Sequence, residues 1–506
     1  LVNVSDSANE LVADFHSVPT VHLALADRDA VVAAAGGEAT LTIGPGTRGK
    51  RAPEVADFSS RGPALSSGSN LLKPDILAPG VDVLAAYSPS NGGYGFDILS
   101  GTSMSSPHGA GLAALVKQKH PTWSASAIKS ALMTTSSQTD NTGAPIPGSP
   151  FDHGAGHVVP TRALDPGIVY ETRWGEWLAF YCGTEAGFAA ALPDLCASLV
   201  AAGYSLDPSQ MNYPSISVAE LAGTKTVRRV IKNVASTTQT YAIAASVPGF
   251  DVALDTTSVT LDPDETAGIT ITFTRTTATP NEFTFGSLTV SNGSYSARST
   301  IALRPRAISA PSEVTIAAGS TSAAYPITFG FSGSLPLSTR GLIPSDPTTG
   351  TVADDPTNEF APGGPGVVAI PVTISAGTTF ARFHLIESSV SVGSDLDLIL
   401  CRADDPTCDA PVGSSADGDS DERIDLRDPE AGEYVLYLHG WETAGGAPSP
   451  YRIERWLLGT ASAGTISASS DPASGTIGGA GTITVTLAGG GLTLPAGSYL
   501  GSVVYG

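Results

Sequence analysis

The sequence is short of basic residues and contains no long apolar run. It has 26 lysines and arginines against 48 aspartates and glutamates, and its formal net charge is −22. Nucleic-acid binding requires a basic patch, and adhesion to anionic membranes requires clustered cations, so the charge balance argues against both. The acidic excess is interpreted as a source of solubility. No stretch of 18 apolar residues occurs, so no helix is predicted to span a bilayer.

Cysteine is scarce, with four residues that fall into two local pairs: Cys182 with Cys196, and Cys401 with Cys408. Such short, even spacing in a Gly-rich chain with only 15% charged residues favours two disulfides and an oxidising compartment. A metal site would need neighbouring histidines or further cysteines, and neither pair has them. The sequence therefore predicts a secreted or extracellular protein without a cysteine-ligated metal.

The 506 residues suffice for about three or more domains. The 56 glycines and 37 prolines favour turn-rich β structure over helical bundles.

The chain is organised around residues 100–111, which follow a predicted strand at 96–99 and begin a helix that runs toward Lys119. A hydroxyl side chain at such a strand-to-helix junction suits a nucleophile, because the helix start offers unpaired amides and a positive dipole end to an oxyanion. The alternative is that Thr102, Ser103 or Ser105 merely caps the helix.

The segment Gly-Thr-Ser-Met-Ser-Ser-Pro-His at 101–108 resembles the serine motif of the subtilisin-like proteases, or subtilases. Further blocks that resemble this family occur in the right order at 57–63, 73–80, 121–133 and 151–157. Over residues 1–305 the resemblance is to large secreted subtilases that have a protease-associated insert and a fibronectin-III-like domain. It implies that Ser103 is the nucleophile and that its amide is an oxyanion donor. It also implies that Thr102 and Met104 lie beside the reacting centre.

Subtilases order their triad Asp, His, Ser. Upstream of Ser103 the only histidines are His16 and His22, and neither lies in the family's His-Gly-Thr-His context. The Asp-Thr-Gly block and the Ala-Gly-Asn context of the oxyanion Asn are also missing. We therefore expect the chain to be a fragment, truncated at both ends, whose triad Asp and His belong to a missing N-terminal part. His16 and His22 are interpreted as structural.

Three other histidines invite a functional interpretation. His108 lies five positions from Ser103, on a different helix face, and is not expected to serve as its base. His153 and His157 have a spacing that would suit a metal on a helix, but Gly154-Ala155-Gly156 between them argues against that helix. Both are interpreted as structural, and no metal site is expected there.

The predicted fold class is multidomain: the C-terminal half of an α/β parallel-sheet subtilase domain, followed by all-β sandwich and jelly-roll domains. Residues 1–37 resemble the end of a protease-associated insert, with a short helix near 27–33. Residues 38–175 form the subtilase half, with a helix from Ser103, a second helix capped by Ser124, and strands near 55–58, 75–78, 83–87 and 96–99.

Residues 176–305 comprise a helical linker and a fibronectin-III-like sandwich, with alternating strands at 226–234, 239–246, 258–261, 268–274 and 286–290. Residues 306–459 resemble the jelly-roll domains of secreted bacterial peptidases, with strong strands at 395–400 and 433–438. Residues 460–506 are expected to start a further β-domain.

Residues 417–422 read Asp-Gly-Asp-Ser-Asp-Glu, and clustered carboxylates of this kind suit calcium. The loop lacks the glycine that an EF-hand needs at its sixth position, and no helix precedes it. A solvated acidic turn is the preferred interpretation, with calcium as the alternative, and no other cofactor is expected.

The resemblance implies a subtilisin-type serine endopeptidase that cleaves protein or peptide substrates through an acyl-enzyme on Ser103. The fragment alone is expected to be inactive. The competing hypothesis is a catalytically inactive subtilase-like protein that binds partners through its β-domains. No nucleic-acid partner and no membrane span are expected, and no pattern specifies an oligomeric state.

Overall fold

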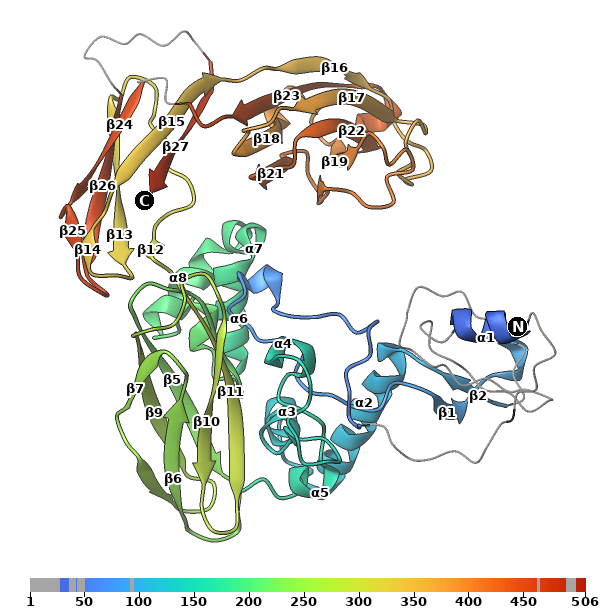
Figure 1. The fold of residues 1–506 in the computed structure, drawn as a ribbon, viewed down its shortest axis with the longest axis vertical. Helices are drawn as coiled ribbons and strands as arrows, with labels where there is room; N and C mark the ends of the chain where they lie inside the picture. The colour runs from blue at the N-terminus through green and yellow to red at the C-terminus, as the bar shows by residue number, and fades with distance from the viewer. Residues whose placement is uncertain (1–27, 36–41, 43–50, 92–94, 462–464, 488–496) are drawn as a thin grey trace. The chain divides into compact units, whose positions relative to one another are not determined.

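The computed structural model describes residues 28–35, 42, 51–91, 95–461, 465–487 and 497–506 (Figure 1). The chain divides into two compact units. The first unit extends to Ser309 and includes 329–331 and 477–479, and the second contains the remaining residues from Ala310 onward.

The first unit begins with short helices and one hairpin. Its elements are α1 (Arg28–Ala35), η2 (Leu65–Ser67), β1 (Val83–Ala86), η3 (Pro89–Asn91), β2 (Phe96–Leu99), α2 (Thr102–Lys119), α3 (Ala125–Thr134), α4 (Pro150–His153) and α5 (Pro160–Ala163). The predicted helices α2 and α3 are both present. Ser124 caps α3, since its Oγ accepts a hydrogen bond from the Ala127 amide at 3.1 Å. Ile128 and Leu132 of α3 pack against Val116 of α2.

The parallel pairing expected for residues 38–175 is reduced, within the described residues, to one bridge between Leu77 and His157. The strands β1 and β2 form an antiparallel hairpin, with Val83 opposite Leu99. The strands predicted at 55–58 and 75–78 are wrong as continuous strands. An apolar segment becomes a strand only when a neighbour pairs with its backbone groups along its length. Here the amide and the carbonyl of Leu77 both bond to the one segment around His157, which gives a single bridge.

A β-sandwich completes the first unit. One sheet has the order β3-β5-β9-β7 and the other β4-β11-β10-β6-β8. The strands are β3 (Ile168–Tyr170), β4 (Ile216–Leu221), β5 (Thr224–Asn233), β6 (Gln239–Ser246), β7 (Phe250–Leu254), β8 (Ser258–Leu261), β9 (Thr266–Arg275), β10 (Thr284–Ser291) and β11 (Ser296–Pro305). Alternate residues of both sheets fill one core, for example Ile231, Ile271 and Leu288. All five predicted strands are confirmed, because each carries the period-two pattern of a half-buried strand.

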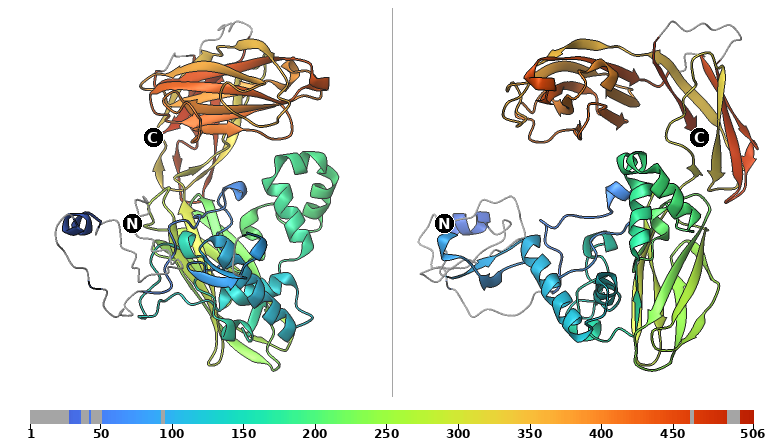
Figure 2. Two further views of the ribbon diagram at one scale, coloured as in Figure 1. Left: turned by 90° about the vertical axis from the view of Figure 1, so that its right-hand side faces the viewer. Right: turned by 180° about the vertical axis from the view of Figure 1, so that it is seen from behind.

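The linker before the sandwich is helical, as predicted. It contains α6 (Trp174–Thr184), α7 (Ala186–Ala191), α8 (Pro193–Ala201) and η4 (Pro208–Gln210), and Figure 2 shows α6–α8 as the grouped green helices. The predicted disulfide between Cys182 and Cys196 joins α6 to α8, with the two Cα atoms 5.7 Å apart.

The second unit contains an eight-stranded sandwich whose sheets have the orders β16-β23-β18-β21 and β17-β22-β19-β20. This interleaved order is that of a jelly roll, which agrees with the prediction for this part of the chain. The predicted strands around 395–400 and 433–438 are neighbours, with Leu398 opposite Leu438. The strands are β16 (Thr348–Val352), β17 (Val367–Ile374), β18 (Phe380–Leu385), β19 (Asp395–Arg402), β20 (Gly413–Ser415), β21 (Arg423–Arg427), β22 (Gly432–Glu442) and β23 (Ser449–Leu458), with η5 (Glu387–Ser389) and η6 (Ala444–Gly446) between them.

The C-terminal stretch does not start a further domain but completes β structure that begins before the jelly roll. The jelly-roll strands end at Leu458, near the predicted division at 459/460, whereas residues 322–344, predicted to belong to the jelly roll, pair with the C-terminal strands. Strands of the C-terminal stretch pair with strands that precede the jelly roll: β13 with β26, β14 with β25, and β15 with β27. Isolated edge strands leave backbone groups unpaired, and this pairing satisfies them. The strands are β12 (Ile308–Ser309), β13 (Ser322–Phe329), β14 (Gly333–Ser334), β15 (Leu337–Pro344), β24 (Ile466–Asp471), β25 (Ser474–Gly475), β26 (Ala480–Leu487) and β27 (Tyr499–Tyr505).

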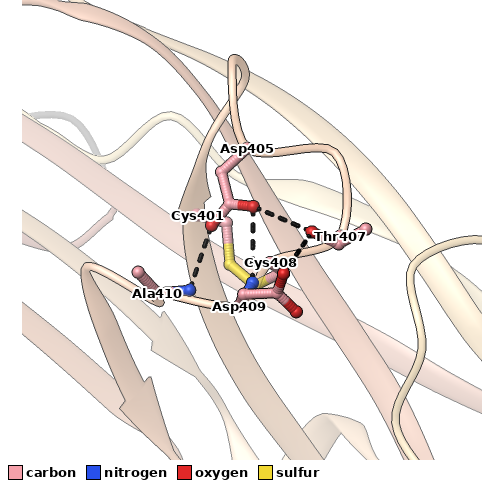
Figure 3. The surroundings of a disulfide bond; sticks show 6 residues. All are labelled: Cys401, Asp405, Thr407, Cys408, Asp409 and Ala410. Atoms are coloured by element: carbon pink, nitrogen blue, oxygen red, sulfur yellow. Dashed lines mark hydrogen bonds between the residues drawn. A yellow bond between two sulfur atoms is a disulfide. The ribbon is translucent and has the colours of Figure 1, made fainter. Parts of the chain in front are cut away.

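The second predicted disulfide joins Cys401, in β19, to Cys408 in the following turn (Figure 3). Asp405 organises this turn. Its carboxylate accepts hydrogen bonds from the amide of Ala410 at 3.0 Å, the amide of Asp409 at 3.3 Å and the hydroxyl of Thr407 at 3.2 Å. These donors, the Ala410 amide first, hold the pKa of Asp405 below its ordinary value although desolvation raises it. The turn is therefore stabilised by hydrogen bonds as well as by the disulfide.

The two disulfides are expected to contribute unequally to stability. Replacing Cys182 and Cys196 by alanine should lower the free energy of unfolding by about 3 kcal/mol, because the bond closes a loop with a sequence separation of 14. The Cys401/Cys408 pair has a separation of 7, and the Asp405 turn persists without it, so its loss should cost less. Calorimetric unfolding of both double variants checks this order, and a larger loss for Cys401/Cys408 would contradict it.

Candidate active site

Ser103 lies in the first turn of α2, directly after the junction of β2 with the helix. Its side chain is exposed, as is that of Thr102, whereas Met104 is half-buried. The residue before the helix is Gly101, and no side chain caps the helix start. Among the described residues, the Ser103 hydroxyl has no hydrogen-bond partner. The alternative that Ser103 serves as a helix cap therefore has no support in the geometry.

The start of α2 offers backbone donors beside this hydroxyl. The carbonyl of Gly101 accepts the amides of Met104 at 3.0 Å and Ser105 at 3.3 Å. Within the described residues, the amides of Thr102 and Ser103 have no acceptor, as is usual for the first positions of a helix. These amides and the positive end of the helix dipole can stabilise negative charge that develops next to Ser103.

Ser105 is only two positions away, but its surroundings differ. Its Oγ donates a hydrogen bond to the carbonyl of Ala78 at 3.0 Å, so this hydroxyl is engaged in anchoring the helix. The sequence motif does not show which of the two hydroxyls forms a hydrogen bond. The structure shows that Ser103 is exposed, whereas Ser105 is hydrogen-bonded to a neighbouring loop.

The loop 78–80 positions the junction of β2 with α2. The amide of Gly101 donates to the carbonyl of Gly80 at 2.8 Å. A Cβ on Gly80 would lie 2.9 Å from the Gly101 carbonyl oxygen and 3.1 Å from the Ser105 Cβ. The close approach of two backbones thus requires glycine at position 80 and fixes where α2 begins.

The other motif blocks pack against one another behind the junction. Gly62 donates its amide to the Phe151 carbonyl at 2.9 Å, and Arg61 forms an ion pair with Asp152 at 3.0 Å. A Cβ on Gly62 would lie only 1.9 Å from the Lys73 carbonyl oxygen, so this contact also excludes other residues. The blocks at 57–63, 73–80 and 151–157 therefore form one scaffold for the helix.

Asp75 is the centre of a charged cluster that joins this scaffold to the sandwich. Its Oδ2 contacts the Lys73 Nζ at 2.8 Å and the Lys129 Nζ at 2.7 Å, and its Oδ1 accepts a hydrogen bond from the Tyr213 hydroxyl at 2.7 Å. Burial raises the pKa of Asp75, but the charges of Lys129 and Lys73 outweigh this effect and hold its pKa below the ordinary value. Burial also lowers the pKa of Lys73 and raises that of Tyr213. These contacts are structural and do not include Ser103.

No histidine in the described part of the chain contacts Ser103. The Nδ1 of His108 bonds the Met104 carbonyl of its own helix at 2.9 Å. His120 bonds the Leu164 carbonyl at 2.8 Å. The histidines at 16 and 22 lie outside the described residues.

His153 and His157 do not share a helix. The helix α4 ends at His153, and His157 instead forms backbone bridges with Leu77 and Ser137. Burial lowers the pKa of both histidines. Across the described residues, the one group of three clustered metal-ligating side chains lies elsewhere, at 417, 419 and 422.

None of the helices that the structure describes has the length and apolar character needed to cross a bilayer.

Two family profiles match the chain: the subtilase family over residues 21–159 and a fibronectin type-III domain over residues 210–303. The subtilase match begins inside residues 1–37, the segment predicted to be the end of a protease-associated insert. Residues up to 27 lie outside the described part of the chain, so the structure does not test that prediction.

Several plant proteins are similar in sequence. Subtilisin-like protease SBT2.5 of Arabidopsis thaliana is 42% identical over 251 residues, which are 44% of this chain and 31% of that protein. SBT1.7 of the same plant is 36% identical over 334 residues, covering 60% and 43%. A CO(2)-response secreted protease, also from Arabidopsis thaliana, is 36% identical over 278 residues, covering 50% and 36%. The chain thus spans less than half the length of these relatives.

Proposed function

We propose that this chain, whose residues 21–159 belong to the subtilase family and whose residues 210–303 are a fibronectin type-III domain, carries the nucleophile of a serine endopeptidase at Ser103. The observation that carries the proposal is the exposed hydroxyl of Ser103, which has no hydrogen-bond partner among the described residues and lies at a helix start without a side-chain cap, within the Gly-Thr-Ser-Met motif. The neighbouring serine that could compete for the role, Ser105, is anchored to Ala78.

In the proposed reaction, the Ser103 Oγ attacks the carbonyl carbon of the scissile peptide bond and gives its proton to a general base. The resulting oxyanion accepts a hydrogen bond from the Ser103 amide, and Thr102 adds a hydroxyl nearby. The amine then leaves with a proton, and water hydrolyses the acyl-enzyme. In the family order Asp, His, Ser, the acid and the histidine base both precede Ser103 in the sequence. We assign both to the complete protein and not to any of the described residues.

The proposed substrates are proteins or peptides, and the proposed location is extracellular. The two disulfides fit an oxidising compartment. One similar plant protein is named a secreted protease.

The experiment that tests the proposal is covalent labelling of the complete protein with a fluorophosphonate, followed by mass spectrometry of the modified peptide. Labelling is expected at Ser103 and is expected to disappear in Ser103→Ala. A folded protein that takes up no label and cleaves no peptide would contradict the proposal and favour the inactive binding protein.

Met104 gives a separate test of the site. Its sulfur lies 3.5 Å from the position of a Cβ on Gly101, so it packs over the junction. The other two methionines of the chain, Met133 and Met211, are buried, at 2% and 4% exposure. Mild peroxide is expected to form the bulkier, polar sulfoxide at Met104 and to lower turnover of the complete protein. Met104→Ala should keep most of its activity under the same treatment, and equal sensitivity of the two proteins would remove Met104 from the site.

A further inference from the structure

The loop between β20 and β21 of the jelly roll brings three carboxylates together. One oxygen each of Asp417, Asp419 and Glu422 lies within 4.8 Å of the others. Like charges at this separation repel one another. Exposed acidic turns are nevertheless common, so this grouping alone does not indicate a ligand.

Glu422 provides the second, independent observation. A solvated acidic turn would leave this side chain in water, but the residue is 0% exposed. Its Oε1 accepts the amide of Asp417 at 3.0 Å, whereas its Oε2 is buried and has no hydrogen-bond partner among the described residues. Burying an unpaired carboxylate oxygen is unfavourable, and native proteins rarely leave one without a reason.

Within the ranges that the structure describes, no basic side chain neutralises the Glu422 carboxylate. Arg423 follows Glu422 in the sequence, but its guanidinium is directed to Glu313 at 3.5 Å and to Asp425 at 3.4 Å. His384 pairs with Asp421 at 2.8 Å. Among the described residues, Asp417, Asp419 and Glu422 form no ion pair with a basic side chain, so their negative charge remains uncompensated by the protein.

The loop is also held in place independently of these carboxylates. Ser420 is buried, donates its hydroxyl to the Ser394 carbonyl at 2.9 Å and accepts the Leu396 amide at 3.0 Å. This anchor ties the loop to the segment that carries Asp395. The Oδ1 of Asp395 is a further buried carboxylate oxygen that has no hydrogen-bond partner in the described part of the chain.

We propose that Asp417, Asp419 and Glu422 bind one calcium ion in this loop, with Asp395 as a further carboxylate ligand. Calcium is a hard cation that takes six to eight oxygen ligands in adaptable geometry, and every side chain here offers oxygen. Zinc sites in proteins usually include nitrogen or sulfur ligands, and magnesium demands stricter octahedral geometry. The ion would supply the missing partner of the Glu422 Oε2 and compensate the charge of the loop.

Calorimetric titration of the full 1–506 chain, first dialysed against a chelator, tests the site with calcium chloride as the probe. One binding event is expected, with a dissociation constant of about 10⁻³ M or tighter, and weaker binding of magnesium. Glu422→Gln keeps the shape of the side chain but removes the charge, and it is expected to weaken calcium binding about tenfold or more. The matched control is Glu387→Gln, an exposed glutamate of the same jelly roll, which should bind as the unmodified chain does.

If Glu422→Gln fails to fold, the variant Asp419→Asn still tests the proposed calcium site. Asp419 is exposed, and its Oδ1 accepts only the Asp421 amide at 2.8 Å, a bond that asparagine can retain. Weakened calcium binding in this folded variant supports the proposal. The absence of any calcium binding by the unmodified chain, or unchanged binding in Asp419→Asn and Glu422→Gln, overturns it. Neither result depends on peptidase activity, so the proposed function is tested separately.

Discussion

Replacing Ser103 by alanine is expected to lower the peptidase turnover of the complete protein by about six orders of magnitude. The nucleophile of an acyl-enzyme mechanism has no substitute, and the members of such a site act as a unit. Stability should hardly change, by less than about 0.5 kcal/mol, because the side chain is exposed and unpartnered among the described residues. Turnover of a peptide substrate and the thermal midpoint, measured on the same preparation, check both expectations.

Ser105→Ala is the matched control, since it makes the same chemical change two positions along the same helix. It removes the hydrogen bond to the Ala78 carbonyl and should cost about 1 kcal/mol of stability. Its turnover should stay within about tenfold, because this hydroxyl does not attack the substrate. If Ser105→Ala abolished activity and Ser103→Ala spared it, the assignment of the nucleophile would be wrong.

Among the single substitutions proposed, Asp75→Asn is expected to have the largest effect on stability. The change leaves the ammonium groups of Lys73 and Lys129 beside a half-buried neutral amide, since the Asp75 side chain is 19% exposed. Breaking a fully buried ion pair typically costs about 3–5 kcal/mol. Both lysine side chains are more than a third exposed, at 36% and 38%, so solvent screening reduces the expected loss to about 2–3 kcal/mol. Urea unfolding at pH 7 measures it.

The pH dependence of that loss identifies its electrostatic origin. The pKa of Asp75 is lower in the folded protein than its ordinary value of 3.8, so its contribution is present above pH 3.8 and is lost as the pH falls through the lower folded value. The difference between Asp75→Asn and the unmodified protein should therefore shrink in strong acid. Asp251→Asn, on an exposed position of β7, should change stability by less than about 0.5 kcal/mol at either pH. A difference for Asp75→Asn that does not vary with pH would contradict the role of its charge.

Much of the candidate site follows from local sequence. The motif at 101–108 indicates the nucleophile, and the apolar strand at 96–99 predicts the helix start after it. The contacts that distinguish Ser103 from Ser105 do not follow from it. They depend on Ala78 and Gly80, more than 20 positions earlier, whose backbone approaches α2 only in the folded chain.

The sequence by itself determined the elements whose signals are local. The cap at Ser124, the period-two strands of the fibronectin type-III domain and the two short cysteine spacings each place partners within a few residues or repeat a pattern along one strand. Such signals can be interpreted without knowing which distant segments pack nearby, because the hydrogen bonds and the burial pattern that they predict are set by the segment itself.

Only the tertiary structure decided which segments meet. The residues at 75–78 have the composition of a strand but form a single bridge with a neighbour. The strands β25, β26 and β27 pair with strands before residue 345, on the other side of the inserted jelly roll in the sequence. Burial of Glu422 in a loop that reads as solvated was decided in the same way, by the anchor of Ser420 on Ser394. Strand pairing and burial depend on groups supplied by remote parts of the chain. A local pattern does not specify which remote part will pair with the segment or cover it.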